Sequence, residues 1–257
     1  MTSEAKETGS GLTAELKELC QAVSEDFAML ASLHNKEPDA ELLRLLRDER
    51  FPEGLGLRLV EERGAQAVAF MQRALSALPD QMGQADLDEL AADYADIYLN
   101  HGIQASPLES VWTDDENLVC QDSMFQVREW YQQHGLMSTD WRIIPDDHLV
   151  LQLQFLSHLF AAGKTMDDLR EIARFMDEHL LRWLTSFAER VAGRCATPYF
   201  AGIALLTGAY SEELRELLVS ILDEPRPTPE EIEDKMRPRR VEEPVEVKFM
   251  PGMGPVV

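Results

Sequence analysis

Apolar residues recur at intervals of three and four along most of the chain, and this periodicity limits the possible fold more than any other feature. One run places Leu149, Leu153, Leu156 and Phe160 at such intervals, and a longer run does the same over residues 169–191. This spacing puts the side chains on one face of a helix. No stretch alternates apolar and polar residues between hairpin turns, as strands would. The sequence therefore predicts an all-α fold, a single helical bundle.

The same spacing, together with prolines and glycines as stops, predicts where the helices lie. The expected helices span residues 12–30, 40–47, 66–78, 86–99, 124–134, 149–161, 166–192, 198–207 and 211–222. Residues 1–11 are polar, and seven of the 13 prolines fall in residues 223–257. Such segments bury too little apolar surface to offset the entropy of ordering them. We therefore expect a disordered N-terminus (1–11), a helical domain (12–222) and a disordered tail (223–257).

Charge and cysteine content limit the possible partners and compartment. The net charge is −23 and the isoelectric point is about 4.5, which disfavours nucleic acid and anionic lipid and favours basic peptides; solubility alone is the other explanation. No apolar run reaches the roughly 20 residues of a membrane span, so we expect no membrane insertion. The start of the chain does not resemble a secretory signal. The three isolated cysteines suit reduced thiols, and we expect a cytoplasmic protein.

The segment from Arg142 to His148, Arg-Ile-Ile-Pro-Asp-Asp-His, leads directly into a predicted core helix. Pro145 breaks any helix at its own position. Asp146 or Asp147 is then expected to cap the following helix, because a short carboxylate accepts hydrogen bonds from first-turn amides, and the other is available to a ligand. His148 either lies buried and hydrogen-bonded in the first turn or contacts a ligand directly.

Enzymatic interpretations find little support in the residues. The sequence has neither a phosphate-binding GxxxxGK[ST] loop nor a GxSxG nucleophile motif. On a continuous helix His148 and His158 would be separated by ~15 Å, too far to share one metal ion. A hydrolase built on Asp146, Asp147 and His148 is the weakest of the hypotheses. We expect a protein without enzymatic activity, metal or cofactor.

Four segments, in the same order, resemble the TorD/DmsD family of cytoplasmic molybdoenzyme maturation chaperones. They are Ser106-Pro-Leu-Glu-Ser-Val-Trp-Thr113, Val127-Arg-Glu-Trp-Tyr-Gln-Gln-His-Gly135, Pro145-Asp-Asp-His148 before the apolar helix, and His179-Leu-Leu-Arg-Trp183 followed by Thr197-Pro-Tyr-Phe200. The resemblance covers roughly residues 87–222. The proline-rich tail has no counterpart in the family pattern.

The resemblance implies a chaperone that binds the twin-arginine signal peptide and the apo form of a molybdopterin oxidoreductase precursor. Such a chaperone assists cofactor insertion and delays export until folding is complete. A receptor for this peptide needs carboxylates for the arginines and an apolar surface for the rest. The residues expected to bind the partner are Pro145, Asp146, Asp147, His148, Glu109, Trp112 and Tyr131. For Glu109, capping of a short turn is an equally good interpretation.

One alternative function and two oligomeric states remain open. The chain could be a non-enzymatic helical adaptor that binds another basic or amphipathic peptide, partly through its tail. It could be a monomer, or a dimer in which the C-terminal helices exchange about a hinge at Pro145.

Overall fold

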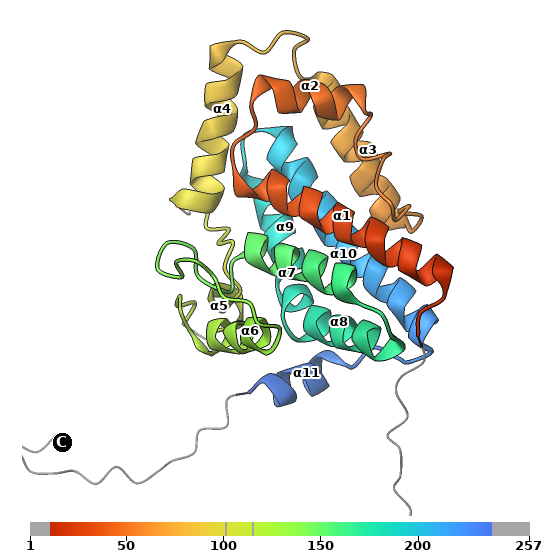
Figure 1. The fold of residues 1–257 in the computed structure, drawn as a ribbon. Coiled ribbons are helices and arrows are strands. Elements are labelled where there is room, and N and C mark those ends of the chain that lie inside the picture. Colours follow the sequence, from red (N-terminus) through yellow and green to blue (C-terminus); the bar gives the residue numbers. More distant parts are fainter. Residues whose placement is uncertain (1–10, 101, 115, 238–257) are drawn as a thin grey trace, which may run out of the picture.

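The computed structural model describes residues 11–100, 102–114 and 116–237, and within them the backbone forms helices joined by loops (Figure 1). The helices are α1 (Ala14–Asn35), α2 (Ala40–Asp48), α3 (Glu62–Ala77), α4 (Gln84–Tyr94), α5 (Ser110–Thr113), α6 (Asp122–Gln133), α7 (Leu149–Ala162), α8 (Met166–Glu178), α9 (Leu184–Arg194), α10 (Pro198–Leu222) and α11 (Pro229–Met236). A π-helical turn (Ala95–Leu99) continues α4, and a 3-10 turn (Leu180–Arg182) separates α8 from α9. The predicted all-α class is confirmed.

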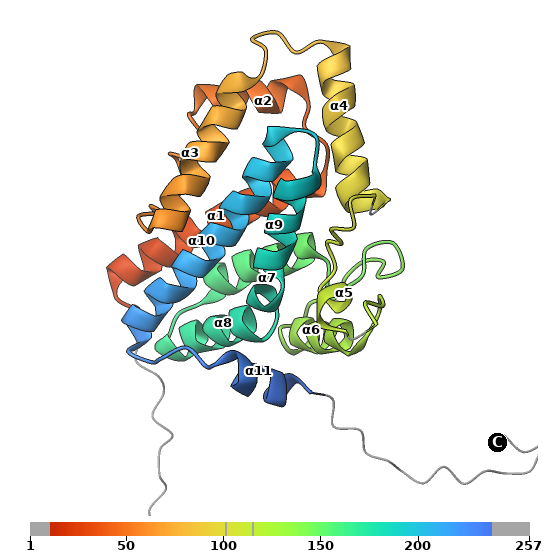
Figure 2. The ribbon, with the colours of Figure 1, turned by 180° about the vertical axis from the view of Figure 1, so that it is seen from behind.

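Helices α1, α7 and α10 form the centre of the bundle, with α3 and α9 packed against α10 (Figures 1 and 2). Phe27 of α1 stacks on Phe160 of α7, with ring centroids 6.0 Å apart, and meets the edge of Tyr210 of α10 at 5.5 Å. All three rings are buried. Aromatic burial of this kind explains why the apolar stripes on these helices face one another.

Helices α2, α3 and α4 lie at one end of the molecule, and α5, α6 and α11 lie at the other (Figure 1). α11 runs beside α8, which it contacts. No described helix has the combination of length and apolarity that crossing a membrane requires.

The prediction of one helix over residues 166–192 is wrong in one respect, because the structure breaks it at His179 and Trp183. His179 has φ −125° and ψ −79°, and Trp183 has φ −135° and ψ −23°, both outside helical geometry. Both side chains are buried. The segment contains no glycine or proline, so the break follows from tertiary packing. Conversely, the two helices predicted over 198–207 and 211–222 form the single helix α10.

The expected disordered tail also differs from the structure over its first part. Thr228 begins a capping box with Glu231, and Pro229 occupies the first turn of α11, a position that proline favours. Ile232 and Met236 are buried. The composition of this stretch suggested disorder, but these local signals and two apolar contacts are enough to place a short helix on α8. Residues 1–10 and 238–257 lie outside the described residues.

Candidate functional site

Two loops that are far apart in the sequence pair with each other at the start of α7. The first spans residues 106–110 and the second spans residues 145–149, and together we call them the joint. The amide of Leu149 donates to the carbonyl of Pro107 at 2.8 Å, and an antiparallel bridge links the two loops beside this bond. The joint therefore fixes the orientation in which the chain enters the core helix α7.

Asp147 holds the two loops of the joint together from within. Its side chain is fully buried, and Oδ2 accepts a hydrogen bond from the Ser110 amide at 2.8 Å. Burial raises the pKa of the Asp147 carboxyl, against the opposing effect of the bond from Ser110. The expectation that Asp146 or Asp147 caps α7 is wrong: His148 is the N-cap, and its Nδ1 accepts from the Val150 amide at 3.1 Å.

Asp146 is also buried, and it is paired within the protein. Its Oδ2 accepts from Arg128 Nε at 2.6 Å, and its carbonyl accepts from the Tyr131 hydroxyl at 2.9 Å. Burial raises the pKa of Tyr131 well above its ordinary value, so this hydroxyl keeps its proton and remains a donor. The Arg128 guanidinium lies 5.0 Å from the ring centroid of Trp141 and 5.3 Å from that of Phe125. Arg128 thus connects the joint to two aromatic rings near the surface.

Glu109 lies at the centre of a buried polar cluster; it occupies the N-cap position of the short helix α5, but its side chain accepts no hydrogen bond from that helix. The residue is fully buried, and Oε2 accepts from Gln152 Nε2 at 2.7 Å. Oε1 lies 3.1 Å from His179 Nδ1 and 3.6 Å from Arg182 Nη1. Arg182 also reaches Glu233 of α11, with Nη2 at 2.8 Å from Oε1. Glu109 therefore stabilises buried cationic and polar groups, and Arg182 links this cluster to α11.

The remaining residues of the predicted site lie nearer the surface. Trp112 is half-buried; its Nε1 donates to the Ser106 carbonyl at 2.9 Å, and the Arg190 guanidinium lies 4.3 Å from its ring centroid. Pro145 and His148 are half-buried as well. Of the seven predicted residues, Asp146, Asp147, Glu109 and Tyr131 are thus buried structural groups, whereas Trp112, Pro145 and His148 retain exposed surface.

Large exposed apolar side chains gather in the stretch that precedes the joint. Among the described residues, seven of the eleven exposed large apolar side chains fall between positions 118 and 144: Leu118, Val119, Phe125, Met137, Trp141, Ile143 and Ile144. Ile143 is 77% exposed and stands two residues before Pro145. We call Phe125, Trp141, Ile143 and Ile144 the apolar surface. Exposed apolar groups next to one another mark interaction sites, and none of these four is among the seven binding residues predicted from the sequence.

A small apolar pocket lies between the C-terminal end of α6 and α7. Its volume is about 250 Å³, and its lining includes Leu136, Met137, Leu151 and Phe155. Met137 is 85% exposed at the rim. The pocket is large enough to receive one apolar side chain of a partner.

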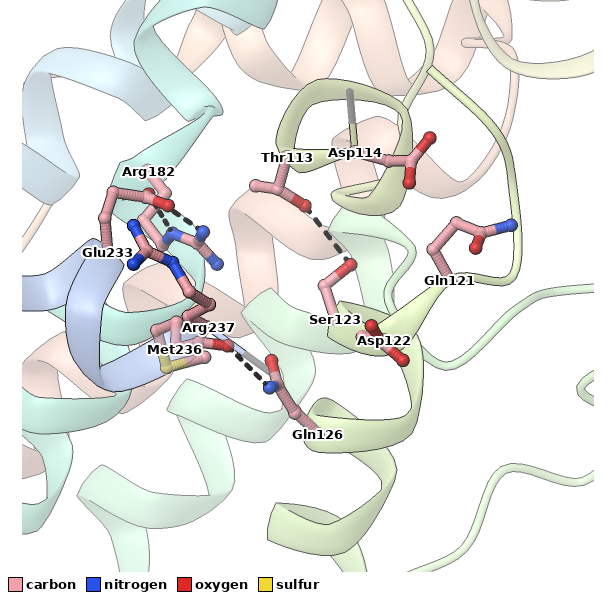
Figure 3. Close-up of a pocket in the computed structure, with 10 residues that line it drawn as sticks. All are labelled: Thr113, Asp114, Gln121, Asp122, Ser123, Gln126, Arg182, Glu233, Met236 and Arg237. Carbon is pink, nitrogen blue, oxygen red and sulfur yellow. Dashed lines mark hydrogen bonds and ion pairs between the residues drawn. The ribbon is translucent and has the colours of Figure 1, made fainter. Parts of the chain in front are cut away.

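A larger and more polar groove lies at the N-terminal end of α6, and we call it the α6–α11 groove (Figure 3). Its volume is about 590 Å³. The lining residues are Thr113, Asp114, Gln121, Asp122, Ser123, Gln126, Arg182, Glu233, Met236 and Arg237. Figure 3 shows Asp114 and Asp122 on the wall formed by α5, α6 and the loop between them, with Arg182 and the end of α11 on the opposite wall. Over the described part of the chain, no three His, Cys, Asp or Glu side chains are arranged to hold a metal ion.

Comparisons of the sequence with known proteins find one matching family and several similar chaperones. Residues 61–189 match the sequence model of the family described as nitrate reductase delta subunit. The chaperone protein TorD of Vibrio cholerae serotype O1 is 29% identical over 218 residues, which cover 82% of this chain and 98% of the relative. TorD of Vibrio vulnificus is 30% identical over 189 residues, covering 69% and 86%. TorD of Shewanella oneidensis is 28% identical over 200 residues, covering 75% and 88%.

Proposed function

The chain belongs to the TorD family of chaperones, and on this premise we propose that it binds the twin-arginine signal peptide and the apo form of a molybdopterin oxidoreductase precursor in the cytoplasm. Binding of this precursor, its client, would assist insertion of the cofactor and delay export until the client has folded. The family consists of chaperones, so the expectation that the protein is not an enzyme is confirmed.

The observation that carries the proposal is the position of carboxylates and apolar groups around α6. The α6–α11 groove, with Asp114 and Asp122, lies at the start of the helix, and the apolar pocket lies at its end. The apolar surface continues to Pro145. A ligand with two arginines followed by an apolar stretch needs both kinds of surface. The net charge of −23 would also speed its encounter with the protein.

The joint has a positioning role in this proposal. Asp146, Asp147, Glu109 and Tyr131 hold the two loops and α6 in place through the bonds described above. Pro145, His148 and Trp112 remain our candidates for direct contact with the peptide, together with the apolar surface.

Simple energetics indicate which contacts dominate. Exposed ion pairs contribute about 1 kcal/mol each at most, so two arginines supply about 2 kcal/mol. Micromolar affinity requires about 8 kcal/mol. The remaining ~6 kcal/mol corresponds to at least ~240 Å² of buried apolar area at about 25 cal/mol per Å², before the entropic cost of association is included. The apolar surface must therefore provide most of the affinity.

A titration with a fluorescent synthetic peptide tests the proposal. The peptide carries two adjacent arginines followed by an apolar stretch, and the control peptide replaces both arginines with glutamines. We expect Ile143→Ser to weaken binding of the arginine peptide about tenfold, because it removes exposed apolar area at the joint. Val60→Ser is the matched control, since Val60 is 70% exposed but lies in the loop before α3.

Two results would contradict the proposal. Equal weakening by the two substitutions would show that the apolar surface is not the site. Equal binding of the arginine and glutamine peptides would favour the alternative function, an adaptor for amphipathic segments in general.

A further inference from the structure

The wall of the α6–α11 groove that α11 provides is anchored to the body of the protein. Ile232 and Met236 are buried. Glu233 accepts from Arg182, and Lys235 pairs with Glu178 of α8. The end of α11 therefore has a defined position, and the chain that follows begins from a fixed point.

That fixed point lies inside the groove. Gln126 of α6 donates from Nε2 to the carbonyl of Met236 at 3.0 Å, so α6 already binds the main chain at the end of α11 (Figure 3). Arg237 is itself a lining residue. Twenty residues follow it, at positions 238–257. Because each extended residue spans about 3.3 Å, Arg239 and Arg240 are separated by no more than about 10 Å of chain from Arg237, which itself lines the groove.

The chemistry of the following residues complements that wall. Positions 239 and 240 are both arginine, and apolar residues follow at Val241, Val245, Val247 and Phe249. Asp114 accepts hydrogen bonds from the amides of its own loop, but neither it nor Asp122 forms an ion pair within the described part of the chain. Glu242, Glu243 and Glu246 stand among the apolar residues of the tail, so it is the adjacent arginine pair that matches the ligand of the proposed function.

We propose that residues 238–257 of the chain itself occupy the α6–α11 groove, with Arg239 and Arg240 against Asp114 and Asp122, and exclude a basic segment of a client until they are displaced. Occupation of the groove by the tail does not depend on the proposed function; the competition with a client does. A tethered segment acts at an effective concentration in the millimolar range. If its own Kd is about 0.1 mM, it weakens a competing peptide about tenfold.

Hydrogen exchange on the full-length protein tests occupation without any peptide. The double variant Arg239→Gln/Arg240→Gln should exchange amides of residues 118–126 several times faster than the unmodified chain, because the covering segment is released. Lys248→Gln removes one positive charge from the same tail and should leave these rates unchanged. Asp122→Asn tests the opposite wall and should reproduce the faster exchange. Amides of the central helix α10 serve as the internal reference for an intact fold.

Equal exchange of residues 118–126 in all four proteins would overturn the proposal. Faster exchange in the Lys248→Gln variant as well, to the same degree as in the double variant, would also overturn it, because the effect would then reflect tail charge and not the arginine pair.

The fluorescent arginine peptide then tests the competition. Its affinity should rise about tenfold in the Arg239→Gln/Arg240→Gln variant and should not change in Lys248→Gln. Unchanged affinity together with faster exchange would overturn the competition, because the peptide would then bind away from the groove. Absence of peptide binding to every variant would refute the proposed function, while the exchange result would still decide whether the tail occupies the groove.

Discussion

Substitution of Asp147 separates a positioning role from direct contact with a ligand. Its fully buried carboxylate accepts the Ser110 amide at 2.8 Å. A hydrogen bond to a charged group contributes about 1.5–3 kcal/mol, and a buried amide left without an acceptor costs about 1–3 kcal/mol. The desolvation that raises the pKa of Asp147 offsets part of the stabilisation from this hydrogen bond. We therefore expect Asp147→Ala to lower the free energy of unfolding by about 2–3 kcal/mol.

Asp147→Asn is the matched control, because it keeps an oxygen that can accept the Ser110 amide. We expect it to cost about 1 kcal/mol or less at neutral pH, since an amide avoids the desolvation of a charge. The pKa of Asp147 is raised, so the folded protein binds its proton more tightly than the unfolded chain. Stability from this group therefore falls as pH rises from about 3.9 through the raised pKa. The asparagine variant should lack this fall.

Urea unfolding followed by circular dichroism at pH 4 and pH 7 measures both effects, and the peptide titration is run on the same samples. Asp147→Ala should weaken peptide binding only through the displaced joint, so it should lose stability and affinity together. A variant whose unfolding free energy changes by less than about 0.5 kcal/mol, the usual range for surface substitutions, while its peptide affinity falls tenfold would refute the reasoning. Asp147 would then contact the ligand, as the sequence suggested.

Three further predictions concern the core and α11. Burial lowers the pKa of His34 to about 3, so as pH falls the His34 imidazole takes up a proton in the unfolded chain before it does so in the folded protein. The protein should therefore lose about 2 kcal/mol of stability between pH 7 and pH 5. His34→Gln should remove that loss in urea titrations. Arg215→Ala should cost about 3 kcal/mol in the same assay, the low end for a broken buried ion pair, because Asp177 keeps its contact with Arg226. Ile232→Ala should speed amide exchange in α11 while the unfolding midpoint of the remaining helices stays unchanged.

The sequence by itself determined the helical class and most of the helices. α2, α6 and α7 begin and end within two residues of their predicted ranges, and Thr165 and Asp168 form a capping box at the start of α8. These features depend on residues three or four positions apart, which is the range over which a helix places side chains on one face or satisfies its first amides.

Only the tertiary structure decided which polar residues remain available to a partner. Asp146 and Asp147 look like surface acids in the sequence, but both are buried in the fold, Asp147 against Ser110 of the other loop and Asp146 against Arg128 of α6. The break at His179 arises likewise, because its ring is buried against Glu109. Burial depends on contacts between distant segments, whereas periodicity reports only on neighbours. The apolar surface and the groove could therefore be located only once α5, α6 and α11 were placed beside one another.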